Sequence, residues 1–145
     1  MALTVVTGPP TAGKTSWVLA RAKPGDIVID YDRLAVALTG PGADSHDHSQ
    51  AVKAVALAAR RVAINEALRH ADTVDVYVIH TMPSEQSQAR YREHGAHIIV
   101  LDPGRDVVLR RCEELRQPAM RAAVERWYAQ RRNLPPSTPQ SSRAW

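Results

Sequence analysis

Cysteine is almost absent from the sequence, which contains only Cys112. A single cysteine excludes an internal disulfide and a four-cysteine zinc site, so we expect Cys112 to serve in helix packing. Long apolar runs are lacking as well, because none approaches the roughly 20 residues that a membrane-spanning helix needs. The first residues, MALTVVTGPP, show neither a basic leader nor a small-residue cleavage site. We therefore expect a cytoplasmic protein without a membrane partner.

Acidic residues are scarce towards the C-terminus. Residues 1–104 contain ten Lys or Arg and eleven Asp or Glu. Residues 105–145 contain nine Lys or Arg but only four Asp or Glu. This asymmetry indicates that the C-terminal part meets an anion, either the phosphates of a small ligand or a nucleic-acid backbone. A solvated helical face is the alternative interpretation.

Size and composition are typical of one soluble domain. The chain has 145 residues, of which 44% are apolar and 23% are charged. We place a single domain at residues 1–136 and a polar, proline-containing tail, extended or loosely held, at residues 137–145. We expect a monomer or a weak oligomer.

Short apolar runs alternate with helical segments along the chain. We predict buried strands at residues 3–7, 26–31, 74–81 and 97–102, and helices at residues 13–22, 50–71, 83–95, 102–117 and 118–132. Such alternation predicts an α/β fold, a three-layer sandwich in which helices flank a parallel sheet of about four to five strands. Ligands of these folds bind beyond the carboxyl ends of the strands, so the segments that follow the strands are the places to look for chemistry.

A glycine-rich segment follows the first predicted strand. Gly8, Gly13, Lys14 and Thr15 satisfy the pattern G-x-x-x-x-G-K-[ST] between a strand and a helix, which is a phosphate-binding loop, or P-loop. We expect Lys14 to reach the β- and γ-phosphates of ATP or GTP and the Thr15 hydroxyl to hold Mg²⁺. The predicted nucleotide-binding residues are Gly8, Pro9, Pro10, Thr11, Ala12, Gly13, Lys14, Thr15 and Ser16. The fold is then a P-loop NTPase-type sandwich.

Two carboxylates end the second predicted strand. Asp30 and Asp32 are two residues apart and would lie on the same side of an extended chain, facing the phosphate loop. One carboxylate would orient the acceptor hydroxyl and take its proton, and a second group would help to hold Mg²⁺, which we assign to Thr15 and Asp32. Alternatively, Asp30 caps the strand end and Asp32 caps a following short helix. We expect Asp30 and Arg33 to contact the substrate.

The phosphate loop and the segment IDYDR together resemble the polynucleotide 5′-kinase and zeta-toxin branch of the P-loop kinases. The resemblance implies that Asp32 is the catalytic base. It also implies a lid at about residues 104–132, in which Arg111 and Arg116 are catalytic and Arg110 is a further substrate contact. The chain departs from the pattern at Ala35, where an arginine or lysine is usual.

Other segments allow more than one interpretation. The third strand exit carries His80 in place of an acidic residue, and His80 either contacts phosphate or acceptor or is a satisfied histidine at a strand end. Trp127 and Tyr128, on a basic helix, either stack with single-stranded nucleic acid or pack on the core. The loop with His46 and His48 is better explained as an acceptor-side flap than as a metal site. The RWY helix and the SRAW ending also resemble small phage-encoded P-loop ATPases.

These observations favour an ATP- and Mg²⁺-dependent kinase that transfers the γ-phosphoryl group to a hydroxyl, with a nucleic-acid 5′-hydroxyl as the favoured acceptor. A kinase for a nucleoside, sugar or nucleotide-sugar is one alternative. A nucleotide-binding ATPase switch that acts on DNA or on a protein partner is the other.

Overall fold

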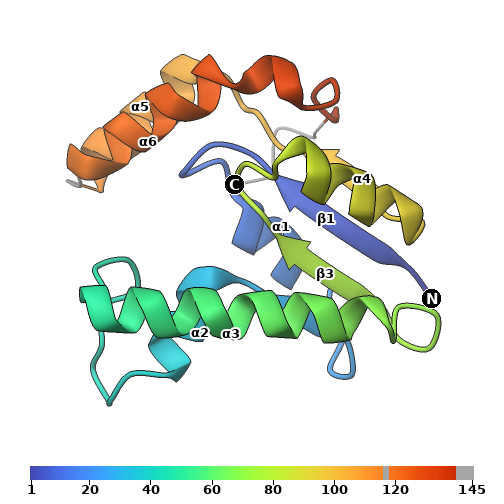
Figure 1. Cartoon of the computed structure of the whole chain (residues 1–145). Coiled ribbons are helices and arrows are strands. Elements are labelled where there is room, and N and C mark those ends of the chain that lie inside the picture. Colours follow the sequence, from blue (N-terminus) through green and yellow to red (C-terminus); the bar gives the residue numbers. More distant parts are fainter. Residues whose placement is uncertain (116–117, 140–145) are drawn as a thin grey trace.

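Figure 1 shows the computed structural model of the chain, which describes residues 1–115 and 118–139. The strands are β1 (Leu3–Thr7), β2 (Ile27–Ile29), β3 (Val76–Ile79) and β4 (His97–Val100). The helices are α1 (Lys14–Leu19), α2 (Tyr31–Ala37), α3 (Gln50–Leu68), α4 (Glu85–Glu93), α5 (Arg105–Glu114), α6 (Pro118–Ala129) and the 3-10 turn η1 (Arg131–Asn133).

The four strands form one parallel sheet in the order β2-β3-β1-β4. One face of this sheet packs against α2, α3 and α4 through a cluster around Val5, Val78 and Ile64. The opposite face packs against α1 through a cluster around Val6, Val18 and Leu101. The predicted α/β architecture with helices on both faces of a parallel sheet is therefore confirmed. No helix in the described part of the chain is long and apolar enough to cross a membrane.

The order of the strands fixes where side chains can converge. β1 lies between β3 and β4, so the segments that follow β1, β3 and β4 emerge at the same edge of the sheet, and β2 ends beside β3. Helices α5 and α6 follow β4 and pack on each other through Val108, Cys112 and Val124. Cys112 is buried there, as expected for a packing residue.

Several predicted boundaries were wrong. The helix expected from residue 102 begins at Arg105, because the Asp102 carboxylate accepts the Gly104 N–H at 3.0 Å and the Tyr128 hydroxyl at 2.6 Å, which holds a turn before the helix. The strand expected at residues 26–31 ends at Ile29. The start of the tail is not loose, since Thr138 exchanges two hydrogen bonds with Val100 of β4. Residues 140–145 lie outside the described residues.

The aromatic pair on α6 packs on the core. Trp127 is 2% exposed, and its indole N–H donates to the Thr81 carbonyl oxygen at 2.8 Å. Tyr128 lies edge-on to Trp127 and is bonded to Asp102. Of the two interpretations of this pair, the structure shows packing, and the two rings do not form an exposed stacking platform.

Candidate functional site

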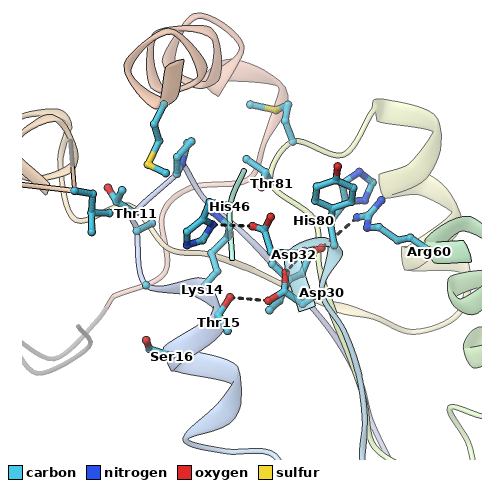
Figure 2. A pocket seen from close by; sticks show the side chains of 18 of the residues that line it. Thr11, Lys14, Thr15, Ser16, Asp30, Asp32, His46, Arg60, His80 and Thr81 are labelled. Carbon is cyan, nitrogen blue, oxygen red and sulfur yellow. Dashed lines mark hydrogen bonds and ion pairs between the residues drawn. The ribbon is translucent and has the colours of Figure 1, made fainter. Parts of the chain in front are cut away.

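A cavity of about 500 Å³ lies at the carboxyl edge of the sheet. Its walls come from residues 10–13 and the start of α1, the β2–α2 junction, His46, the end of β3 and the middle of α3. Leu115, just after α5, and Met120 of α6 complete them. Figure 2 shows the side chains that point into it. The volume falls within the range of small-molecule sites, about 300 to 1,000 Å³.

Loop 8–15 has a backbone that few residues can adopt. Gly8 has a φ of 154°, and a Cβ there would lie 2.3 Å from the Leu101 carbonyl oxygen. Gly13 caps α1 with a φ of 93°, in the left-handed region that favours glycine. Thr11 also has a positive φ, of 66°, and its hydroxyl donates to the Val108 carbonyl at 3.1 Å. The glycine pattern in the sequence therefore serves a tightly curled loop held against α5.

Lys14, the first residue of α1, folds over this loop. Its Nζ donates to the carbonyl oxygens of Gly8 at 2.9 Å and Pro9 at 2.7 Å. Burial lowers its pKa from 10.5 to about 8, and the charges of Asp30 and Asp32 oppose that shift only in part. The ammonium group is therefore a desolvated cation at the cavity wall, which is a favourable arrangement for an anionic ligand.

Thr15 and Asp30 lie in direct contact. The Thr15 hydroxyl donates to Asp30 Oδ2 at 2.8 Å, while Asp30 Oδ1 accepts the Asp32 N–H and caps α2. The expectation that Asp30 and Asp32 share one side of an extended strand was wrong, because the helix begins at Tyr31 and Asp32 lies in its first turn. Both carboxylates nevertheless line the cavity, because the N-cap and the first turn point towards loop 8–15.

Asp32 is held by two histidines of loop 42–49. His48, which is 8% exposed, places Nε2 3.0 Å from Asp32 Oδ1, and His46 places Nδ1 3.3 Å from Asp32 Oδ2. Tyr31 packs edge-on against the His48 ring. The loop therefore lies against Asp32, and its His46 lines the cavity. The acceptor-side flap expected here stays a prediction, and the pairing of the loop histidines with Asp32 was not foreseen.

The far wall of the cavity contains His80 and Arg60. His80 Nδ1 lies 2.9 Å from the Tyr91 hydroxyl, and burial together with the neighbouring Arg60 lowers the pKa of His80 to about 4. Arg60 projects from α3 towards the end of β3 (Figure 2). Sequence reasoning missed Arg60. Its position four residues from the buried Ala56 and Ile64 is the signal that could have found it, since this spacing places a charge on the buried stripe of a helix.

The structure places the three predicted lid arginines, Arg110, Arg111 and Arg116, and the predicted substrate contact Arg33 differently. Arg111 on α5 donates to the Thr11 carbonyl oxygen at 3.0 Å and so ties α5 to loop 8–15. Arg110 and Arg33 are exposed, and neither lines the cavity. Arg116 lies outside the described residues. Only Arg111 of this set is therefore brought to the loop by the described structure.

The oxygen atoms near loop 8–15 fit magnesium better than a transition metal. Among residues 1–115 and 118–139 there is no group of three or more His, Cys, Asp or Glu side chains that could hold a metal ion. The Thr15 hydroxyl and the Asp30 carboxylate are hard oxygen donors in contact, and Mg²⁺ typically takes one or two such protein ligands and completes its shell with water and phosphate. The structure therefore puts Asp30, rather than the expected Asp32, beside Thr15.

Comparison with protein-family models gave no match, and a search of curated proteins gave none either.

Proposed function

We propose that the protein is a phosphotransferase that moves the γ-phosphoryl group of ATP or GTP to a hydroxyl with the help of Mg²⁺. The observation that carries the proposal is the convergence of Lys14, Thr15, Asp30 and Asp32 on one cavity, at the edge of the sheet where parallel α/β folds bind ligands. Loop 8–15, which follows the phosphate-binding sequence pattern, forms one wall of that cavity.

Each of these residues has a chemical task in the proposed reaction. Lys14 neutralises charge on the transferred phosphoryl group, since arrangement and electrostatic stabilisation dominate phosphoryl transfer. Thr15 and Asp30 would hold Mg²⁺, which would neutralise negative charge on the phosphates when it is bound. The acceptor oxygen bonds to the γ-phosphorus, the bond from that phosphorus to the bridging oxygen breaks, and the nucleoside diphosphate leaves.

Asp32 is the candidate proton acceptor. Its carboxylate lines the cavity, and the two histidine contacts fix its orientation, so the acceptor hydroxyl would meet a base that is already in place. Arg111, held on loop 8–15, is the arginine best placed to act from the lid. Both a kinase and an ATP-hydrolysing enzyme orient their nucleophile with such a group, so Asp32 supports phosphoryl transfer and the destination of the labelled phosphate distinguishes the two.

The acceptor is better matched by a small molecule than by a nucleic-acid end. Trp127 and Tyr128, the aromatic residues of the basic helix, are engaged with Thr81 and Asp102 and are not available for stacking on bases. On the same helix, Arg121 pairs with Glu113 at 3.8 Å. The cavity of about 500 Å³ beside Asp32 is of a size that suits a small hydroxyl compound.

The test is transfer of label from γ-labelled ATP or GTP, with Mg²⁺, to nucleosides, sugars, their phosphates and 5′-hydroxyl oligonucleotides. We expect label on a small acceptor, its loss in Lys14→Ala, and a fall of about 100-fold or more in kcat for Asp32→Asn with nucleotide binding retained. Asp72→Asn, which removes an exposed carboxylate, is the matched control and should behave as wild type. Label that appears only as free phosphate, at a rate unchanged in Asp32→Asn, would refute the kinase and favour the ATPase switch.

A further inference from the structure

Arg60 is a cation in a position where helices normally place apolar side chains. It lies in the middle of α3 on the same stripe as Ala56 and Ile64, both of which are buried against the core. Burying the stem of an arginine here places the guanidinium at the end of β3 rather than in open solvent. A charge so placed costs free energy unless something compensates it.

The protein compensates this charge only in part. Arg60 Nη2 donates to the Ile79 carbonyl oxygen at 3.1 Å, but Nε is buried and has no hydrogen-bond partner. None of the ion pairs among residues 1–115 and 118–139 includes Arg60. The arginine therefore lines the cavity with donor capacity that no carboxylate of the described structure uses.

Burial lowers the pKa of Arg60, and the nearby negative charge of Asp30 opposes that shift only in part. His80 is neutral near pH 7, because its pKa is lowered to about 4, and so it adds no competing anion or cation. Leu57 and Met82 line the same cavity and add no charge to it. In Figure 2, Asp30 and Asp32 lie between Arg60 and the side chains of loop 8–15. The cavity thus has one cation at each end and carboxylates between them.

We propose that Arg60 binds an anionic group on the phosphoryl acceptor, so that the acceptor is a small hydroxyl compound that also carries a phosphate or a carboxylate. This inference rests on the proposed phosphotransferase. The acceptor hydroxyl lies at Asp32, on the side of loop 8–15, and its anionic group lies at Arg60, where the guanidinium offers planar, bidentate donors. Tyr31, the one tyrosine that lines the cavity among the described residues, is held edge-on against His48.

The first experiment tests the anion site without any catalysis. Unfolding temperatures are measured in sodium phosphate and in sodium chloride of equal ionic strength for the wild type, Arg60→Met and Arg61→Met. Arg61 is the neighbouring exposed arginine of α3 and serves as the matched control. Phosphate that binds at loop 8–15 stabilises all three proteins equally, so the difference between them isolates Arg60. We expect Arg60→Met to lose about half or more of the stabilisation by phosphate and Arg61→Met to keep it.

The second experiment tests the acceptor. Glycerol, glycerol phosphate and glyceric acid form one set, and a nucleoside and its monophosphates form another. In each set the charged members replace one hydroxyl group of the neutral compound with an anionic group and keep the others as acceptors. We expect the wild type to prefer a charged member by about tenfold or more in kcat/KM, through KM. Arg60→Met should lose that preference, Arg60→Lys should recover part of it, and Arg61→Met should keep it. The preferred member identifies the anion as phosphate or carboxylate.

The outcomes separate this inference from the proposed function. Equal stabilisation by phosphate in all three proteins overturns the Arg60 site, whatever the kinase assay shows. Equal acceptor preference in the wild type and Arg60→Met, or transfer to oligonucleotides alone, overturns the small anionic acceptor. A phosphate effect that depends on Arg60, in a protein that phosphorylates no acceptor, would retain the anion site and reject the phosphotransferase.

Discussion

Replacing Lys14 with methionine should make the protein more stable at neutral pH and should abolish the nucleotide binding that we propose. The pKa of Lys14 is lowered from 10.5 to about 8 because the ammonium group is desolvated. At about 1.4 kcal/mol per pKa unit, this shift corresponds to about 3 kcal/mol of unfavourable free energy in the charged, folded protein. The two hydrogen bonds from Nζ to loop carbonyls contribute about 0.5 to 1.5 kcal/mol each, so we expect a net gain of about 0 to 2 kcal/mol in the free energy of unfolding.

The gain in the free energy of unfolding that we expect for Lys14→Met should decrease as the pH rises. The unfolded chain holds the Lys14 proton up to about pH 10.5, whereas the folded protein loses it from about pH 8. The cost of the charge is therefore complete below pH 8 and fades as the pH rises towards 10.5, so the advantage of Lys14→Met over the wild type shrinks in that interval. Urea unfolding at pH 7 and pH 9.5 measures this difference, and Lys53→Met, an exposed lysine of α3, is the control. A Lys14→Met protein less stable than the wild type at pH 7 would refute the reasoning.

Three further predictions test the fold around the site. Gly8→Ala should destabilise the protein by more than about 3 kcal/mol, because its Cβ would meet a backbone carbonyl oxygen at 2.3 Å, whereas Gly25→Ala, with open space around it, should cost far less; thermal unfolding compares the two. Trp127→Phe should lower the free energy of unfolding by about 1 to 2 kcal/mol through loss of the indole hydrogen bond, measured by urea unfolding. His80 should stay neutral down to about pH 4 in an NMR titration of the folded protein. Because the His80 side chain of the unfolded chain already binds a proton near pH 6.5, the free energy of unfolding should decrease as the pH falls from 6.5 towards 4. A titration of His80 near pH 6.5 in the folded protein would contradict this.

The alternation of strands and helices was predictable because parallel strands buried on both faces form continuous apolar runs. The four runs found in the sequence correspond to β1 to β4, and the glycine pattern of loop 8–15 falls between β1 and α1, where it was expected. These features are local, so the order of residue types along the chain is enough to predict them.

The features that the sequence did not predict depend on contacts between segments that are separated along the chain. Whether the chain at Asp30 continues as a strand or begins a helix is decided by its carboxylate, which is held by the Thr15 hydroxyl and accepts an N–H of α2. The histidines of loop 42–49 reach Asp32 across the fold, and no periodicity indicates that contact. The spacing of Arg60 from the buried Ala56 and Ile64 of α3 indicates its position, but Arg60 lies within a helix and not after a strand, where ligand-binding residues were expected.

The contact between Thr138 and Val100 closes an edge of the sheet. β4 bonds to β1 on one side, and Leu101 N–H, just beyond it, donates to Thr7, so by alternation Ile98 and Val100 turn their backbone groups outward. Thr138 occupies both outward groups of Val100, at 2.8 and 3.0 Å. Exposed strand edges are templates on which other chains add strands and aggregate. The segment after η1 thus shortens the open edge of β4, and a chain cut before it would present an apolar strand to its neighbours.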